Sequence, residues 1–197
     1  MKNKIILLAL AFTFMSAAVS AQGTSSVEKT NESGDAFSKG SVSLMIASGF
    51  GVSYNYYGDY VSLPALTVAV DIGIFDNAGP GNIGVGGIVG FKRAFNRRDG
   101  YDATWTNFLI AGRGTYHLTL VDNSKFDPYA GVTAGIRINE YRDPSFNDLP
   151  NPNNYNSIYP VAGVFVGAKY NFIPGFGGFV ELGYDISIVR VGVSFNF

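Results

Sequence analysis

The sequence predicts an all-β protein: an eight-stranded antiparallel up-and-down transmembrane β-barrel. Three observations lead to this prediction. Apolar side chains recur at every second position through most of residues 40–197, which is the period of a β-strand. The alternate face mixes glycine and serine with charged residues, which are costly against lipid. Longer and shorter connections alternate along the chain, as they do at the two ends of a membrane barrel.

Residues 1–21 have the pattern of a secretory signal peptide. A lysine-containing start precedes an apolar stretch, and small residues then form a cleavage pattern. The apolar stretch is too short to span a bilayer as a helix. We therefore expect export through the inner membrane and cleavage before Gln22. Residues 22–39 are polar and have no period, so we expect a flexible periplasmic segment there and the barrel at residues 40–197.

Eight stretches of the chain carry the alternation. They are residues 41–54, 65–75, 82–95, 106–120, 129–139, 160–172, 178–185 and 187–197. The first has mostly small and hydroxyl-bearing residues opposite its apolar face. The second, third and fourth place Asp71, Lys92 and Arg113 there.

The last four stretches continue this pattern. The alternate face carries Arg137 in the fifth stretch and Lys169 in the sixth. The seventh carries Glu181 and Asp185, and the eighth carries Arg190. The eighth strand must pair with the first, because closing the sheet removes its exposed edges.

The connections indicate which end of the barrel faces outward. Those after the first, third and fifth strands are longer, whereas those after the second, fourth and sixth are turns rich in Asp, Asn, Pro and Gly. We expect the longer ones outside the cell, and a tight last hairpin at residues 185–187. The loop at residues 141–158 has three prolines and several asparagines, so it is either a site for an extracellular partner or a solvated linker.

Two kinds of eight-stranded barrel share this pattern. A soluble lipocalin-type barrel turns its apolar face inward around a ligand, whereas a membrane barrel turns it toward lipid. Eight strands enclose just enough space for side chains, and a row of Val, Ile, Leu and Phe from every strand would overfill it. Small residues and a few charged ones fit better, so we expect the apolar face outside.

Aromatic residues gather near both ends of the expected strands. We expect them to form two girdles at the membrane interfaces. The outer set is Tyr54, Tyr56, Tyr57, Tyr60, Phe95, Tyr101, Trp105, Tyr141, Tyr155 and Tyr159, and the inner set is Phe75, Phe126, Tyr170, Phe172, Phe176, Phe195 and Phe197.

In "FDPYAGVTAGIRI" (residues 126–138) and "GGFVELGYDISIVRVGVSFNF" (residues 177–197), the chain resembles the small eight-stranded outer-membrane β-barrel proteins of Gram-negative bacteria, the porin-like outer-membrane β-barrel domain. The resemblance implies a location in the cell outer membrane, with outer-membrane lipid and lipopolysaccharide around the barrel. It also implies that Val193, Phe195 and Phe197 form the signal read by the barrel-assembly machinery. The family includes adhesins, pores, anchors and lipid-modifying enzymes, so it does not fix an activity.

The charged side chains of the alternate face are expected to pair inside the lumen, because an unpaired buried charge is costly. They are Asp71, Lys92, Arg113, Arg137, Lys169, Glu181, Asp185 and Arg190. One interpretation is a structural plug of ion pairs. The alternative is a narrow, mildly anion-selective pore, since five of these residues are basic and three are acidic.

The sequence offers few parts for a catalytic or metal site. His117 is the single histidine and there is no cysteine, so metal-ligand clusters and a Cys–His nucleophile are excluded. His117 and Thr119 are superficially similar to the His and Ser of outer-membrane lipid A deacylases, but the expected register turns His117 into the lumen. We expect no cofactor.

Charge argues against nucleic acid as a partner. Removing the two lysines of residues 1–21 from the 14 basic residues leaves 12 against 15 acidic ones, and there is no basic patch. We therefore expect a non-enzymatic outer-membrane protein with a structural, membrane-integrity or surface-interaction role of the adhesion type. The alternative is a small porin-like channel with a narrow charged lumen, and an outer-membrane lipid-modifying enzyme is the third possibility.

Overall fold

The computed structural model describes residues 36–51, 60–96, 103–119, 125–143 and 155–197. These residues belong to one compact unit, Ser33–Phe197. The expected signal peptide and most of the expected flexible segment lie outside the described residues. Within them, no helix is long and apolar enough to cross a membrane.

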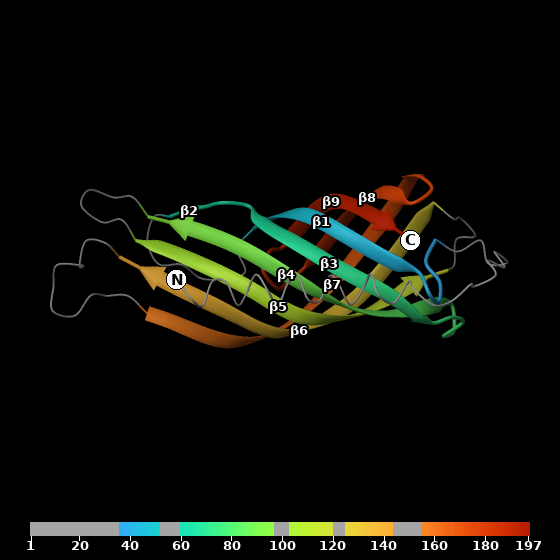
Figure 1. The fold of residues 1–197 in the computed structure, drawn as a ribbon, viewed down its shortest axis with the longest axis horizontal. Helices are drawn as coiled ribbons and strands as arrows, with labels where there is room; N and C mark the ends of the chain where they lie inside the picture. The colour runs from blue at the N-terminus through green and yellow to red at the C-terminus, as the bar shows by residue number, and fades with distance from the viewer. Residues whose placement is uncertain (1–35, 52–59, 97–102, 120–124, 144–154) are drawn as a thin grey trace. The chain divides into compact units, whose positions relative to one another are not determined.

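The described residues form an antiparallel sheet that closes on itself (Figure 1). Its strands are β1 (Val42–Phe50), β2 (Val61–Ser62), β3 (Ala65–Phe75), β4 (Gly81–Phe95), β5 (Thr104–Leu118), β6 (Phe126–Arg142), β7 (Tyr155–Ile173), β8 (Phe176–Gly183) and β9 (Val189–Asn196). Each long strand pairs with its neighbours in chain order, and β9 pairs with β1. The ring therefore has eight strands, as the sequence predicts. The two-residue β2, which the sequence pattern does not predict, adds to the end of β4.

The seam between the first and last strands is continuous. Ile46 lies opposite Val193, and Val42 exchanges both backbone hydrogen bonds with Phe197, at 3.0 and 2.9 Å. Every long strand thus has partners on both sides along part of its length. The predicted pairing of the first and eighth strands is confirmed.

Alternate side chains face opposite sides of the sheet, and burial separates the two sets. Large apolar side chains on the outer face remain exposed, with Leu66 at 62%, Val132 at 57% and Val164 at 66%. On the inner face, charged side chains are buried, with Asp71 fully covered and Arg113 at 4%. Strand register fixes this division, because a slip of one residue would exchange the two faces.

Small residues allow the strands to approach one another on the inner face. A Cβ placed on Gly86 of β4 would lie 1.8 Å from the carbonyl oxygen of Val70 and 2.8 Å from Asp71 Oδ1. Glycine therefore makes room for a charged side chain in a lumen that eight strands leave narrow.

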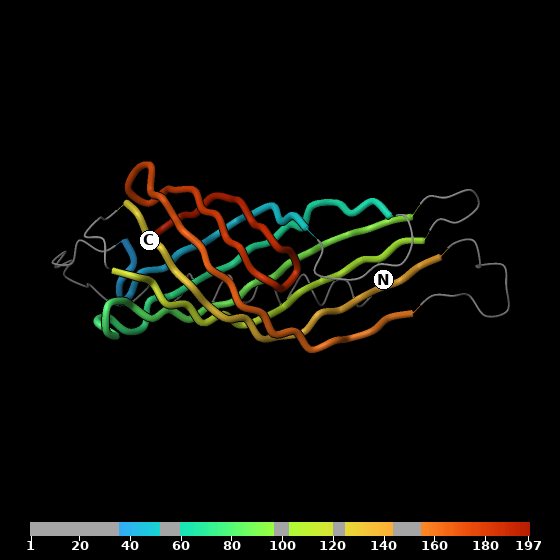
Figure 2. The backbone as a smooth tube through the Cα atoms, turned by 180° about the vertical axis from the view of Figure 1, so that it is seen from behind, coloured from blue at the N-terminus to red at the C-terminus, as the bar shows by residue number. Residues whose placement is uncertain are grey.

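The strands differ in length, so the wall of the barrel is uneven. β4 and β5 have 15 residues each, β6 has 17 and β7 has 19, whereas β8 and β9 have eight each. β8 pairs with β7 only from Phe165 onward, and residues 155–164 of β7 pair with β6 alone. The outer ends of the four long strands project past β8 and β9 (Figures 1 and 2). We call residues 91–95, 104–108, 137–142 and 155–160 the extension.

The aromatic side chains divide differently from the expected girdles. At the inner end, Phe172 packs against Tyr170 and Phe176 on the outer face, with ring centroids 5.8 and 6.1 Å apart. On the extension, Tyr155 lies opposite Tyr141, which lies opposite Trp105. Trp105 is an even number of residues from Arg113 on β5, and Tyr141 is an even number from Arg137 on β6. All three aromatic side chains therefore lie on the inner face. Tyr159 lies opposite Arg137 and shares its face. The assignment of Trp105, Tyr141, Tyr155 and Tyr159 to an outer girdle is therefore wrong.

Candidate functional site

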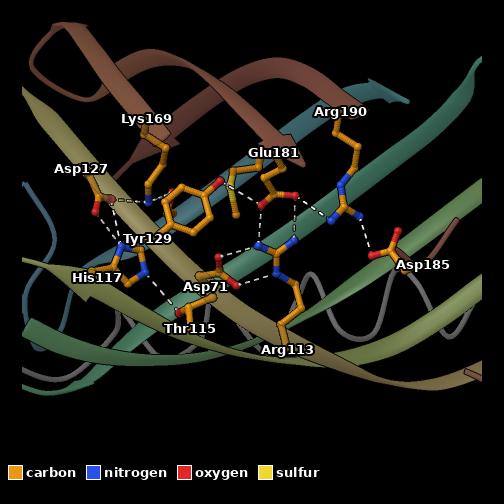
Figure 3. Close-up of polar contacts among 12 residues, drawn as sticks. Asp71, Arg113, Thr115, His117, Asp127, Tyr129, Lys169, Glu181, Asp185 and Arg190 are labelled. Atoms are coloured by element: carbon orange, nitrogen blue, oxygen red, sulfur yellow. Dashed lines mark hydrogen bonds and ion pairs between the residues drawn. The ribbon is translucent and has the colours of Figure 1, made fainter. Parts of the chain in front are cut away.

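The centre of the lumen holds a cluster of buried ions around Arg113 of β5 (Figure 3). Arg113 Nη2 lies 2.7 Å from Glu181 Oε1 of β8, and its Nε lies 3.2 Å from Asp71 Oδ1 of β3. The guanidinium also lies over the Phe165 ring, 4.3 Å from the centroid. These side chains meet because Gly86 and similar small residues leave the axis of the barrel free.

Arg190 of β9 continues the cluster toward the outer end. Its Nη2 lies 2.7 Å from Glu181 Oε2, and its Nη1 lies 2.9 Å from Asp185 Oδ2. Glu181 therefore bridges two guanidinium groups, and each carboxylate of the cluster contacts a cation. The five residues are all at most 4% exposed, so these are desolvated ion pairs.

A second cluster lies toward the inner end of the lumen, near Phe37 and the end of β9. Lys169 Nζ contacts Asp127 Oδ2 at 2.9 Å, and His117 Nδ1 lies 2.8 Å from Asp127 Oδ1. His117 Nε2 lies 3.1 Å from Thr115 Oγ1. Tyr129 joins the two clusters. Its ring lies 5.2 Å from that of His117, centroid to centroid, and its hydroxyl donates a hydrogen bond to Glu181 Oε1 at 2.8 Å.

The structure brings together six of the eight charged residues expected in the lumen. Asp71, Arg113, Glu181, Asp185 and Arg190 form the central cluster and Lys169 the inner one. Lys92 lies apart and donates hydrogen bonds to the carbonyl oxygens of Gly51 and, at 3.4 Å, Ile186. Arg137 lies over the Tyr159 ring, 5.0 Å from its centroid.

Asp127 and Tyr129 are lumen residues that the sequence reasoning missed. Both lie on the inner face of β6, and counting in twos from Arg137 would have placed them there. The composition of "FDPY" favours a turn followed by a strand, whereas β6 begins at Phe126. The alternation thus contained the signal for these residues, but not the identity of their partners across the lumen.

Phe37 closes the inner end of the lumen. Its ring stacks on His117 with centroids 3.7 Å apart, and Lys169 Nζ lies 4.8 Å from its centroid. Its carbonyl oxygen accepts a hydrogen bond from Asn82 Nδ2 at 2.7 Å, and the residue is 2% exposed. Of the expected flexible segment at residues 22–39, the structure describes residues 36–39, and Phe37 differs from that expectation because its ring is buried in the barrel.

Ile186 closes the lumen on the other side of the central cluster. Residues 184–188 connect β8 to β9, and Asp185, Ile186 and Ser187 turn inward, with Ile186 completely buried. A Cβ on Gly90 would lie 2.9 Å from Ile186 Cδ1, so glycine makes room for this side chain. The expected tight hairpin at 185–187 is in fact an inward fold that fills the barrel.

The inner cluster has the order of groups found in hydrolytic triads: a hydroxyl, an imidazole and a carboxylate. Thr115, His117 and Asp127 are all at most 4% exposed, and Phe37 covers the imidazole. A reacting group therefore has no place beside the hydroxyl. Thr119, considered with His117 in the sequence, donates its hydroxyl to the Pro80 carbonyl oxygen at 3.1 Å instead. The described residues contain no group of three or more His, Cys, Asp or Glu side chains that could hold a metal ion.

The extension carries a different arrangement on its inner face. The rings of Trp105 and Tyr141 lie 5.3 Å apart, and those of Tyr141 and Tyr155 lie 4.9 Å apart at 25°. One row below, Asn139 lies between Asn107 and Ser157. Of the expected loop at 141–158, both ends belong to strands β6 and β7, and residues 144–154 lie outside the described part of the chain.

A comparison with solved structures finds similarity to outer-membrane and designed β-barrels. No family model matches the sequence, and no curated protein matches it. The N-terminal β-barrel domain of Pseudomonas aeruginosa OprF is 15% identical, with a TM-score of 0.44, over 81% of this chain and 98% of that one. The attachment invasion locus protein Ail of Yersinia pestis is 15% identical, with a TM-score of 0.47, over 81% and 99%. A designed transmembrane β-barrel is 13% identical, with a TM-score of 0.42, over 81% and 97%. These similarities are of fold alone.

Proposed function

We propose that the protein is an integral barrel of the outer membrane with a non-enzymatic structural or surface-interaction role. The outer face supports the location. Large apolar side chains from the strands stay exposed around the barrel, among them Leu66, Val132 and Val164. A soluble monomer rarely exposes so much contiguous apolar surface, and lipid is the environment that stabilises it.

The filled lumen is the observation that carries the proposal of a non-conducting barrel. Ion pairs occupy the middle, Phe37 covers the inner end and Ile186 the outer end. Ions would have to displace buried, mutually paired side chains to pass. The porin-like alternative therefore requires a rearrangement of the lumen. The proposed structural or surface-interaction role depends on the outer surface of the barrel and not on its lumen.

The extension supports a surface-interaction role of the adhesion type. It is the part of the barrel that continues where β8 and β9 have ended, and it ends in the connection between β6 and β7. With Phe37 and Phe197 at the periplasmic end, the extension points out of the cell. Outer-membrane lipid and lipopolysaccharide would surround the outer face, and the barrel-assembly machinery would insert the chain.

The test combines location with conductance. The full-length protein is expressed in a Gram-negative host, and outer-membrane fractions are analysed with and without boiling on a denaturing gel. The barrel is expected in that fraction, with a heat-dependent change in migration. Protein purified from it should give no discrete conductance in planar bilayers. Recovery in the soluble periplasm would refute the location, and stable unitary currents would favour the porin-like alternative.

A further inference from the structure

The two edges of the extension differ in how they are covered. At one edge, β2 pairs with the end of β4, and Leu63 N donates to Arg93 O at 2.9 Å. At the other edge, the outer part of β7 pairs with β6 alone, because β8 pairs with β7 only from Phe165 onward (Figure 2). Among the described residues, no strand therefore covers residues 156–162 of β7, which we call the open edge.

The backbone of the open edge presents a row of hydrogen-bonding groups. Val164 O accepts a hydrogen bond from Tyr184 N at 3.0 Å, so Val164 directs its backbone groups away from β6. These groups alternate sides along a strand, and every second residue before Val164 therefore directs its groups the same way. Those residues are Asn156, Ile158, Pro160 and Ala162. All of them offer a carbonyl oxygen, and all except the proline offer an amide donor.

The open edge lies outside the hydrocarbon of the membrane in the proposed orientation. A tilted strand crosses a bilayer with about 9–11 residues. Counted outward from Phe172, which belongs to the aromatic group at the inner end, about ten residues of β7 reach Ala162. Hydrogen bonding supports the same placement, since an unpaired strand edge does not occur against lipid. The open edge is therefore accessible to proteins outside the cell.

The side chains leave the open edge largely unprotected. Its four outward-directed residues are exposed, with Ile158 at 66%. Proteins protect such edges with charged side chains, prolines, bulges or covering segments. Residues 155–164 contain no charged residue, and their pairing with β6 has no register shift. Within the described part of the chain, the open edge thus has one protective feature, Pro160.

An extended polypeptide is the occupant that matches this chemistry. The open edge continues the ladder that β7 forms with β8, so a strand placed beyond Tyr184 meets donors and acceptors at the spacing of its own backbone. A second copy in the same membrane does not fit. A twofold axis along the membrane normal would make two β7 strands cross, because each is tilted by about 35–45°.

We propose that the open edge takes up an extended segment of a protein outside the cell as an added β-strand. Outer-facing side chains of this segment lie beside Ile158 and Val164, both 66% exposed, so alternate β-branched residues suit it. Where the segment passes Pro160, it gains one hydrogen bond in place of two. The inference rests on the proposed surface-interaction function and names the kind of partner.

The test uses the full-length protein in phosphatidylcholine nanodiscs and a short peptide as the probe. The peptide alternates threonine and valine and carries a lysine at each end. Its N-methylated form, which lacks the donors along one edge, is the control. Hydrogen exchange resolved to single residues should slow at Asn156, Ile158 and Ala162 when the peptide is added. Exchange at the intervening residues should not change, because their amides already point toward β6.

Variants separate backbone pairing from side-chain contact. Pro160→Ile supplies the missing donor and should tighten peptide binding by about three- to tenfold, the effect of one hydrogen bond. Ile158→Pro removes a donor and should weaken binding by at least a similar factor of about three. Ile158→Val keeps the donor, so this matched control should bind as the unchanged protein does. Heat-dependent gel migration checks that each variant is folded.

Three results would overturn the inference. The first is exchange that the peptide does not slow, and the second is equal slowing by the N-methylated peptide. The third is exchange at Ile158 that is already as slow as at Ser157 in the protein alone, which would show that another segment of this chain or a second copy covers the open edge. If Ile158→Pro does not fold, Pro160→Ile decides, and an unaltered affinity there counts against the inference.

The outcome also separates this inference from the function on which it rests. Failure of the peptide to bind, with the barrel located in the outer membrane, defeats the inference alone. Absence of the protein from that membrane defeats the proposed function itself.

Discussion

Replacing Arg113 by methionine probes the ion cluster most directly. Arg113 contacts Asp71 at 3.2 Å and Glu181 at 2.7 Å, and both carboxylates are almost completely buried. The cluster of Asp71, Arg113, Glu181, Asp185 and Arg190 has two positive and three negative side chains. Its formal charge of −1 becomes −2 when Arg113 is lost.

The expected cost follows from the partners that remain. Glu181 keeps Arg190 and the Tyr129 hydroxyl, whereas Asp71 loses the cation with which it pairs in the described residues. Leaving one member of a buried ion pair without its partner costs about 3–5 kcal/mol. The double variant Arg113→Met with Asp71→Asn returns the cluster to −1. Because both partners are then neutral, it should recover at least about 2 kcal/mol relative to Arg113→Met.

The assay is reversible urea unfolding of the barrel in lipid vesicles. Trp105 is the single tryptophan, so its fluorescence reports the transition. The unfolding free energy must fall with urea concentration at the same slope in both proteins before their unfolding midpoints are compared. A change in this slope indicates a change in the unfolded state. A cost below about 1 kcal/mol for Arg113→Met, or a double variant no more stable than the single one, would refute the reasoning.

Three further predictions concern the ends and wall of the barrel. Phe37→Ala should expose His117, the single histidine, to diethyl pyrocarbonate; mass spectrometry should find it modified in the variant and protected in the parent, and equal modification would contradict the plug. Phe197→Ala should lower the fraction of folded barrel in cells but leave unassisted refolding into vesicles unchanged; loss of both would point to packing and not to an assembly signal. Gly86→Ala should destabilise the barrel by more than the roughly 1 kcal/mol typical of a point substitution, because its Cβ would lie 1.8 Å from a carbonyl oxygen. Gly87→Ala is the control, since its Cβ would make an ordinary contact at 3.5 Å. Similar thermal melting of the two variants would contradict this prediction.

The sequence predicts the fold well because a membrane barrel repeats one local rule. Alternation alone places Asp71, Arg113 and Arg190 on one face, since each lies at an even spacing from the small residues of its own strand. The same rule, applied strictly, also places Trp105 and Tyr141 on that face. Their position near strand ends favours a girdle instead, and composition alone does not distinguish the two faces there.

The contacts across the lumen could not be predicted in the same way. Which carboxylate meets Arg113 depends on the stagger of strands around the whole ring, and no single strand encodes it. Phe37 lies in a polar segment with no period, and its burial depends on space left by Gly84 and Thr115 in other strands. The burial of Ile186 could not be predicted either, because it lies in a connection between strands, where side chains do not alternate between two faces.

The central ion cluster has a consequence for how the barrel is assembled. Arg113 is 42 residues from Asp71 and 68 residues from Glu181 along the chain, so no single hairpin contains all three. The contacts of Glu181 and Arg190 in this cluster form only when β8 and β9 have joined the sheet. A strand that enters one residue out of step would turn its charge toward lipid and leave its partners alone in the lumen. The cluster therefore favours the correct strand register, because its ion pairs form together only in the correctly closed ring.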